Sequence, residues 1–357
     1  MIKEKEYVEF CKEYSCGHEK STQPIEGQIE LSYKCNYDCL HCYSKRLNKK
    51  KELNTSQWKR ILDDIHNEGT IWLTITGGEP LLRDDFKEIY LYAKNKGFLI
   101  TVFSNGYLFT DNIIKFFTKN PPYLIEISLN SLKADIYKYI TGSPRGALNR
   151  IKKAIKKINR NGINLVLKTN ALKENKEEIV KIKEFSQELL GRKHFKLDYL
   201  IIPKLDGDMA PCRHRLLPAE ILELVKSDRD MRIQMHKIFR ERNRLLRSAK
   251  HLYQCDSWLR KFYITPYGEL RFCALTDKYS ANLKKIKFRE AFYRRSNDIL
   301  KARFKNKIRC INCNLRAICY WCPSRSFLEK GCEESPIAYY CNLAKTMHSK
   351  YGPDIRK

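Results

Sequence analysis

Three cysteines stand close together near the start of the chain. Cys35, Cys39 and Cys42 are separated by three and by two residues. Thiolates at this spacing can wrap one cubane iron–sulfur cluster and leave its fourth iron without a protein ligand. An open metal position suits chemistry rather than a structural role. The alternative for the same residues is a zinc site in which His41 is the fourth ligand.

A glycine-rich turn with one carboxylate follows one strand later. The segment from Thr76 to Pro80 reads TGGEP. Gly77 and Gly78 would let a ligand approach the backbone closely, and Glu79 offers an acceptor for an ammonium group. A Gly-Gly pair also occurs in ordinary turns, so the signal comes from its combination with the cysteine group. Together, the two segments predict one functional site.

Eight further cysteines lie between residues 255 and 341. In a reducing compartment, clustered cysteines are metal ligands more often than disulfides. This segment has few apolar runs, so metal ligation would supply much of its folding energy. The alternative is a zinc ribbon on the CxxC pairs, which leaves several cysteines unassigned. We interpret Cys11, Cys16 and Cys212 as unligated thiols. The eight clustered residues are Cys255, Cys273, Cys310, Cys313, Cys319, Cys322, Cys332 and Cys341.

The elements that must position these residues follow from apolar periodicity. Runs rich in Ile, Val, Leu, Phe and Tyr, as strands prefer, alternate with helical patterns. Helices are expected over residues 83–96 and 145–160, where apolar residues recur at spacings of three and four. The strand-like runs cover residues 27–33, 71–76, 98–104, 123–129, 163–169 and 195–202.

Six strand–helix units in succession predict parallel strands joined by right-handed crossovers. A closed eight-unit barrel needs about 250 residues, so the span 27–225 favours an α/β fold with an open partial (β/α)6 barrel. Both motifs follow strands, at the active-site face of such a barrel. Residues 219–250 are expected to be helical and basic. The predicted organisation is an N-terminal segment at 1–26, the barrel at 27–235 and a small cysteine-rich domain at 236–357.

The cysteine motif followed by GGEP resembles the radical S-adenosylmethionine (SAM) enzymes, whose shared fold is a partial TIM barrel of six units. The resemblance implies that Cys35, Cys39 and Cys42 hold a [4Fe–4S] cluster and that SAM chelates the free iron. For two of the implied SAM contacts, Asn105 and Ser128, the alternative is a polar strand end that caps a neighbouring loop. The implied contacts are His41 near the adenine, Gly77, Gly78 and Glu79 at the methionine amine, Asn105, and Ser128 at the carboxylate or ribose.

The second cysteine group is similar to the SPASM extension, which holds two auxiliary [4Fe–4S] clusters. It departs from the family pattern in having two residues, not three, before Cys322. The resemblance implies three [4Fe–4S] clusters in all. It assigns Cys332 either to the nearer auxiliary cluster or to no cluster. The implied ligands are Cys255, Cys273 and Cys322 for the nearer auxiliary cluster, and Cys310, Cys313, Cys319 and Cys341 for the farther one.

Enzymes with this extension mostly modify peptides or proteins. The resemblance therefore implies cleavage of SAM to a 5′-deoxyadenosyl radical, which takes hydrogen from a peptide or protein during a crosslink, epimerisation, excision or oxidation. A reductant such as flavodoxin or ferredoxin is implied as a partner. Two alternatives stay open. One is a radical SAM step on a small molecule in cofactor or haem biosynthesis. The other is a zinc-stabilised nucleic-acid-binding protein.

Composition and charge limit the remaining classes. The chain has 357 residues, of which 43% are hydrophobic and 31% charged, so a disordered chain is excluded. No run approaches the roughly 18 apolar residues of a membrane span. The first twenty residues are charged and lack a secretory signal, so we expect a cytoplasmic protein with no membrane partner. The net charge of +28 favours an acidic partner.

Basic runs suggest how a peptide substrate would be held. Residues 45–51, 150–160 and 236–250 could attract an acidic leader peptide, or could be solvated loop and helix faces. Residues 1–26 are too few for the N-terminal leader-binding domain of many peptide-modifying enzymes. Substrate capture is therefore expected to use direct docking, a short substrate or a separate leader-binding protein.

Overall fold

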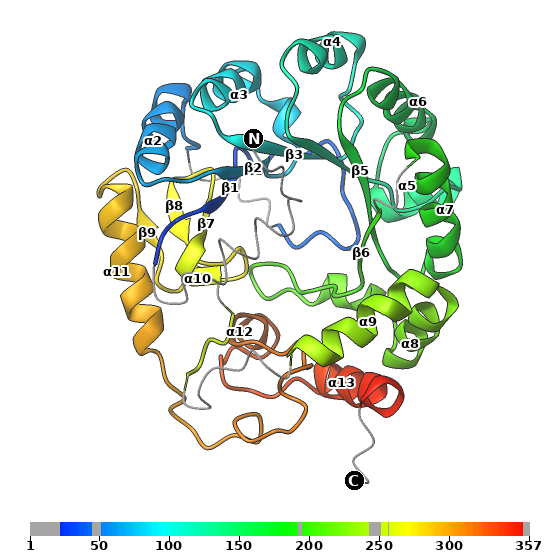
Figure 1. The fold of residues 1–357 in the computed structure, drawn as a ribbon, viewed down its shortest axis with the longest axis vertical. Coiled ribbons are helices and arrows are strands. Elements are labelled where there is room, and N and C mark those ends of the chain that lie inside the picture. The colour runs from blue at the N-terminus through cyan, green and yellow to red at the C-terminus, as the bar shows by residue number, and fades with distance from the viewer. Residues whose placement is uncertain (1–21, 45–50, 192–194, 243–250, 256, 353–357) are drawn as a thin grey trace, which may run out of the picture.

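A curved sheet with helices on its outer face organises the molecule (Figure 1). The computed structural model describes residues 22–44, 51–191, 195–242, 251–255 and 257–352. Its first six strands pair in parallel and follow one another across the sheet in chain order, which confirms the α/β fold with a partial barrel. These strands are β1 (Glu26–Glu30), β2 (Trp72–Thr76), β3 (Leu99–Ser104), β4 (Leu124–Ser128), β5 (Leu165–Asn170) and β6 (Phe195–Asp198).

Amphipathic helices cover the outer face of these strands. On α6, Ile151, Ile155 and Ile158 are all buried, because spacings of three and four place them on one side. The α2 helix begins with a capping box between Asn54 and Gln57. The helices are α2 (Thr55–Asn67), α3 (Phe86–Asn95), α4 (Asp111–Lys119), α5 (Ala134–Thr141), α6 (Ala147–Arg160) and α7 (Ile179–Leu190), with short 3-10 turns η1 (Pro80–Leu82) and η2 (Lys176–Glu178).

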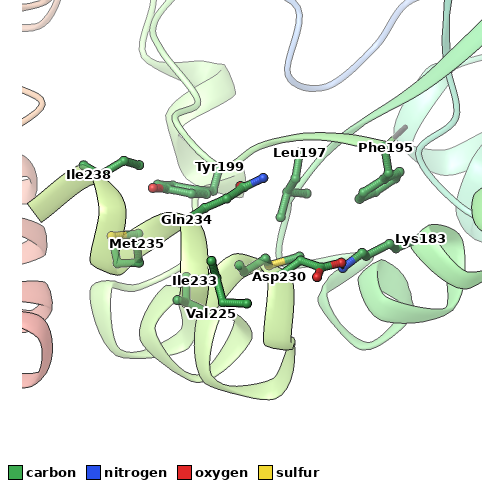
Figure 2. Close-up of a pocket in the computed structure, with 11 residues that line it drawn as sticks. Lys183, Phe195, Leu197, Tyr199, Val225, Asp230, Ile233, Gln234, Met235 and Ile238 are labelled. Carbon is green, nitrogen blue, oxygen red and sulfur yellow. The ribbon is translucent and has the colours of Figure 1, made fainter. Parts of the chain in front are cut away.

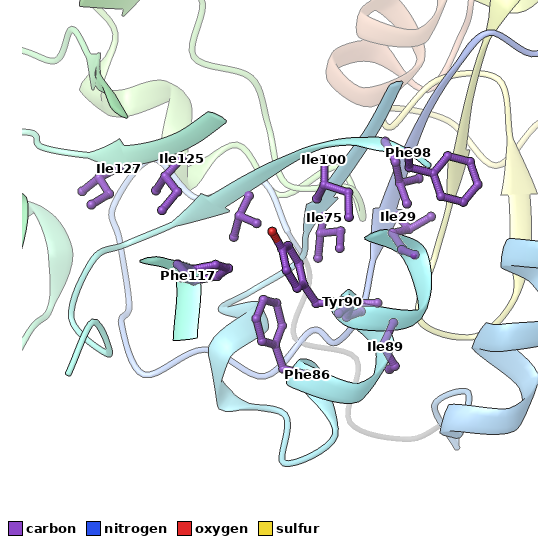
Figure 3. Packing of buried hydrophobic residues seen from close by; sticks show 14 of the residues in the cluster. Ile29, Ile75, Phe86, Ile89, Tyr90, Phe98, Ile100, Phe117, Ile125 and Ile127 are labelled. Atoms are coloured by element: carbon purple, nitrogen blue, oxygen red, sulfur yellow. The ribbon is translucent and has the colours of Figure 1, made fainter. Parts of the chain in front are cut away.

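The main core lies between the sheet and these helices. Figure 3 shows Ile75 and Ile100 of the sheet facing Phe86 and Tyr90 of α3. Because side chains alternate along a strand, the residues between the core positions point to the inner face. That inner face is polar: Glu126 of β4 and Lys196 of β6 form an ion pair at 2.6 Å. The barrel therefore encloses polar groups at its centre.

The cysteine-rich part of the chain extends the same sheet. β7 (Lys261–Ile264) pairs in parallel with β1, and β8 (Glu269–Arg271) and β9 (Ala281–Asn282) continue the sheet in antiparallel fashion. The sequence analysis missed these strands, because runs of two to four residues carry too little periodicity. Phe262 of β7 packs against Gly27, where a Cβ would lie 2.2 Å from the ring. The division of the chain at residue 235 stays a proposal.

The remaining helices join the barrel to the cysteine-rich region. The basic stretch predicted as helical forms two helices that break at Asp228, whose carboxylate accepts from Met231 N and binds Lys183 at 2.6 Å. Residues 243–250 and 45–50 of the basic runs, and Cys11 and Cys16, lie outside the described residues. The elements are η3 (Ala210–His214), α8 (Pro218–Ser227), α9 (Arg229–Arg242), α10 (Ser257–Arg260), α11 (Phe288–Lys301), α12 (Pro323–Lys330) and α13 (Ala338–Tyr351).

Within the described ranges, no helix has the length and apolar character needed to cross a bilayer.

Candidate active site and auxiliary cysteine cavity

The loops after β1 and β2 are joined backbone to backbone. Gly78 N donates to Ser32 O, and Glu79 N donates to Lys34 O, both at 2.8 Å. A Cβ at Gly77 would lie 2.3 Å from Ser32 O, so only glycine fits. The same distance separates a Cβ at Gly78 from Lys34 O. The two glycines thus hold the glutamate loop against the segment that leads into Cys35, a role that the sequence analysis had given to ligand approach.

Glu79 is fully buried, and its carboxylate accepts several hydrogen bonds but contacts no cation among the described residues. Its carboxylate accepts from Ser104 Oγ at 2.9 Å, from Asn105 N at 2.8 Å and from Leu81 N at 3.2 Å. Within the described part of the chain, no lysine, arginine or histidine contacts it. Burial raises the pKa of Glu79 to about 7, and these donors only partly offset the effect. A carboxylate in this state fits an incoming ammonium group.

Asn105 connects this glutamate to the first cysteine. Its backbone N–H donates to Glu79, and its side-chain Nδ2 donates to Asn36 Oδ1 at 2.8 Å and lies 3.9 Å from Cys35 Sγ. Tyr37 N also donates to Cys35 Sγ, at 3.4 Å. The structure therefore brings Cys35, Glu79 and Asn105 together, at the carboxyl ends of β1, β2 and β3.

The other two cysteines of the loop are held differently. Asp38 N and Leu40 N donate to Thr141 O and Ile140 O, both at 2.9 Å, and so satisfy carbonyls at the end of α5. Cys39 Sγ lies 3.7 Å from the same Thr141 O. Cys42 is exposed, with its sulfur 4.0 Å from Ser44 O. These backbone hydrogen bonds hold the loop that carries the three thiols.

His41 places an unsatisfied ring nitrogen in the same loop. Its Nδ1 is buried and has no hydrogen-bond partner in the described structure. Burial lowers the pKa of His41 to about 4, with smaller effects from Lys168 and His214, so the ring is neutral near pH 7. Ser128, at the end of β4, lies opposite Lys168 of β5 in the strand register. The orphan nitrogen and the neutral ring suit a nucleobase neighbour.

Sequence reasoning missed three charged groups near this loop. Lys168 and His214 both act electrostatically on His41. His214 Nδ1 lies 2.6 Å from Glu174 Oε1, in the geometry of a carboxylate that orients an imidazole. A lysine inside an apolar strand run was a signal for Lys168. No local signal marks His214, because its position depends on the segment around η3, where Leu205 N donates to Tyr43 O at 2.9 Å.

Seven of the eight C-terminal cysteines line one cavity of about 590 Å³. Cys332 is exposed and does not line it. The thiols fall into two groups by mutual interaction. Cys273 is influenced by Cys322 and Cys255, while Cys319 is influenced by Cys341, Cys310 and Cys313. The two groups match the nearer and farther sets expected from the sequence, with Cys332 in neither. The lining cysteines are Cys255, Cys273, Cys310, Cys313, Cys319, Cys322 and Cys341.

The chemistry of these thiols suits clusters. Burial raises the pKa of Cys273 to about 12 and that of Cys319 to about 11, so each needs a metal to become a thiolate near pH 7. Among the described residues, no three His, Cys, Asp or Glu side chains converge as ligands of one ion. A cubane binds its thiolates at separate irons and so accepts ligands that are spread around a cavity.

Two other features lie apart from these thiols. Cys212, in η3, has its pKa raised to about 11 by burial, and no other cysteine contributes to that shift. A hollow of about 350 Å³ lies between β6, α8 and α9 and is shown in Figure 2, where Leu197 and Tyr199 face Met235. Its lining contains no cysteine.

Sequence comparisons relate the chain to known proteins. Residues 29–186 match the model of the Radical SAM superfamily. Over 338 residues the chain is 24% identical to the AdoMet-dependent heme synthase of Methanosarcina barkeri, with 87% of this chain and 95% of that protein covered. It is 25% identical over 269 residues to the subtilosin biosynthesis protein AlbA of Bacillus subtilis, and this match covers 73% of this chain and 57% of AlbA.

Solved structures show the same fold. SuiB of Streptococcus suis, bound to its precursor peptide SuiA, superposes with a TM-score of 0.70 at 18% identity, over 92% of this chain and 78% of SuiB. The structure of anSMEcpe with AdoMet and the Kp18Cys peptide gives 0.69 at 15% identity, over 92% of this chain and 96% of that one. Residues 29–186, which contain both the cysteine loop and the buried glutamate, thus form a radical SAM domain by their match to that superfamily.

Proposed function

We propose that this radical SAM enzyme takes hydrogen from a peptide or protein substrate during maturation of that substrate. The observation that carries the radical SAM part is the link from Cys35 through Asn105 to a buried Glu79 carboxylate with no cation beside it. A cluster ligand and an ammonium acceptor would thereby be held at the ends of neighbouring strands, within one site.

Each residue of the site has a role toward the cofactor. When bound, a reduced cluster supplies the electron that breaks the C5′–S bond of SAM, giving methionine and the 5′-deoxyadenosyl radical. Cys35, Cys39 and Cys42 would hold the cluster. Glu79 would accept hydrogen bonds from the methionine ammonium group, and His41 would present a neutral ring to the adenine.

Two further groups would be available to hold the carboxylate of SAM. Ser128 offers a hydroxyl there, and Lys168 offers a cation from the neighbouring strand. His214, oriented by Glu174, is the imidazole available to accept or donate a proton at this end of the barrel.

The cysteine cavity would hold two auxiliary [4Fe–4S] clusters, which brings the total to three. Cys310, Cys313, Cys319 and Cys341 form a full set of four ligands for the farther cluster. The nearer set has only Cys255, Cys273 and Cys322, because Cys332 lies outside the cavity. We therefore propose that Cys332 is not a cluster ligand.

A peptide substrate is supported by the relatives and by charge. The structures with this fold include SuiB bound to its precursor peptide and anSMEcpe bound to a peptide, and AlbA acts in subtilosin biosynthesis. The net charge of +28 would favour a substrate with an acidic leader. We also propose a flavodoxin or ferredoxin as reductant, and a separate leader-binding protein as a further partner.

A small-molecule substrate is the second candidate, because one comparison favours it. The match to the AdoMet-dependent heme synthase covers 95% of that protein, a larger share than the 57% of AlbA. Co-expression of the enzyme with a short open reading frame from its gene neighbourhood distinguishes the two candidate substrates. A mass change in that peptide supports peptide maturation. An unchanged peptide together with turnover of an iron porphyrin supports the alternative.

Cleavage of SAM tests the cluster assignment directly. The anaerobically reconstituted enzyme, reduced with dithionite, should release 5′-deoxyadenosine, and Cys39→Ala should release none. Cys212→Ala is the matched control, because no other cysteine interacts electrostatically with this thiol, and it should leave cleavage intact. Three clusters correspond to about twelve irons and twelve sulfides per chain. Equal cleavage by the wild type and Cys39→Ala, or zinc without sulfide, would refute the proposal and favour the zinc-stabilised nucleic-acid-binding alternative.

A further inference from the structure

The fixed charges around the auxiliary cavity are all positive. Among its lining residues are Arg309, Arg316, Arg325 and Lys345, and the lining contains no aspartate or glutamate. Cations that are buried or lie in a cleft usually have a carboxylate beside them, because each charge loses hydration on burial. The cavity is thus prepared for a group that carries negative charge. Thiolate-ligated iron–sulfur clusters carry such a charge and gain one more unit on reduction.

Arg325 lies against the nearer set of thiols. Its backbone N–H donates to Cys322 Sγ at 3.5 Å, and its Nη1 donates to Tyr320 O at 2.6 Å. Its Nε is buried without a partner among the described residues. The guanidinium interacts electrostatically with Cys322, with Asp198 at the end of β6, and with Cys273. The Tyr320 carbonyl therefore holds the Arg325 guanidinium beside the nearer set of thiols. No carboxylate forms an ion pair with this guanidinium in the described structure.

The farther set of thiols has its own guanidinium groups. Arg309 Nη2 donates to Cys341 Sγ at 3.6 Å. Arg316 donates to the carbonyls of Ile311 and His251, both at 3.2 Å, and acts on Cys310 and Cys313. Arg309 is exposed, whereas Arg325 is largely shielded from solvent. Solvent screening should therefore make the influence of Arg309 the weaker of the two.

We propose that Arg325 and Arg309 raise the reduction potentials of the nearer and farther auxiliary clusters, respectively. The inference rests on the proposed function, because it requires the two clusters. Its physical basis is that cluster potentials depend on nearby charge and on hydrogen bonds to the sulfurs. A fixed cation stabilises the reduced form, which has the greater negative charge, more than the oxidised form.

Redox titration of the reconstituted full chain, followed by electron paramagnetic resonance, tests the inference. In Arg325→Gln the reduction equilibrium of the nearer cluster should weaken at least tenfold, a shift of 59 mV for one electron. The farther cluster should keep its midpoint. In Arg309→Gln the farther cluster should shift by less, in the same direction, while the nearer one is unchanged. Arg325→Lys should recover most of the loss. Cys322→Ser and Cys313→Ala identify which signal belongs to which cluster.

Arg289→Gln is the matched control, because Arg289 is 74% exposed and pairs with Glu68 away from the cavity. Neither auxiliary midpoint should move in it. Midpoints that stay in place in both Arg325→Gln and Arg309→Gln, or that move together in either variant, would overturn the inference. If Arg325→Gln fails to bind the nearer cluster, Arg309→Gln decides alone. Wild-type protein with fewer than about eight irons would instead refute the auxiliary clusters themselves.

Discussion

At the scale of single residues, Glu79 is the group whose protonation state should control the proposed cofactor site. Its carboxylate is fully buried, and its hydrogen bonds come only from neutral donors. Burial therefore raises its pKa to about 7, so that the empty site is half protonated near neutral pH. Between the ordinary glutamate pKa of 4.5 and the raised value of about 7, the folded protein without SAM binds more protons than the unfolded chain. Its stability should fall as the pH rises through about 7.

The affinity for SAM should show the opposite dependence on pH. The ionised carboxylate pairs with an ammonium group, so binding should be tightest above pH 7 and about tenfold weaker near pH 6. Equilibrium dialysis of the reconstituted, unreduced enzyme with labelled SAM measures this profile. Glu79→Gln should lose at least about tenfold in affinity and show no such slope. Glu88→Gln, a change on the exposed face of α3, should reproduce the wild-type curve. A wild-type affinity that does not vary between pH 6 and 8 would show that Glu79 does not bind the amine.

At the scale of elements, the loops after β1 and β2 behave as one unit. The hydrogen bonds from Gly78 N and Glu79 N to the 32–34 segment leave no room for side chains at either glycine. Any distortion of this contact moves the glutamate and the cysteine loop together. A change that weakens this contact should therefore lower both the stability of the protein and its capacity to bind the cluster.

Gly78→Ala should therefore lower both stability and iron content. Its Cβ would lie 2.3 Å from Lys34 O, and overpacking of this kind costs about 1–3 kcal/mol. Gly162→Ala is the control: no atom lies within 4 Å of its added Cβ, and only its φ of +71° opposes the change. Both variants should melt at lower temperature than the wild type, but only Gly78→Ala should lose iron and SAM cleavage. Full iron content in Gly78→Ala would contradict this coupling.

The sequence was informative where local pattern determines structure. Runs rich in Ile, Val, Leu, Phe and Tyr predicted β1 to β6, because each strand buries its own apolar residues. The motif residues Cys35, Glu79 and Asn105 meet as expected, since parallel strands bring their carboxyl ends together. β7 was missed because its four residues carry too little periodicity, and its pairing with the distant β1 has no local signal. His214 was missed because it reaches this end of the barrel through a segment distant in sequence. The true reason for the two glycines also lay in a backbone contact that no local pattern reveals.

At the scale of the whole molecule, buried polar contacts hold the barrel and the cysteine-rich region together. Arg215 and Glu329 form an ion pair at 2.5 Å, with side chains only 8% and 4% exposed. Arg215 also donates to Ile201 O at 2.7 Å. Tyr199 and Tyr320 share a hydrogen bond at 2.7 Å between their hydroxyl oxygens. These contacts join residues 199–215 to residues 320–329.

Removing one partner of the buried pair should be costly. Glu329→Ala leaves the Arg215 guanidinium buried without its anion, a change that typically costs about 3–5 kcal/mol. Glu68→Ala removes the partner of Arg289, which is 74% exposed and stays hydrated, so it should cost less than Glu329→Ala. Urea denaturation measures both values. The double variant Arg215→Met with Glu329→Leu should recover much of the lost stability, because an apolar pair has no unpaired charge. A loss in Glu329→Ala as small as that in Glu68→Ala would show that the pair does not join the two regions.

The pairing of β7 with β1 has a consequence for how the protein is made. β1 leaves the ribosome early, whereas the strand that covers its outer edge is encoded in the last third of the chain. During synthesis the nascent barrel therefore exposes an unprotected strand edge beside the loop of Cys35, in a form prone to wrong pairing. β1 gains its second neighbouring strand only after residues 261–264 have been translated.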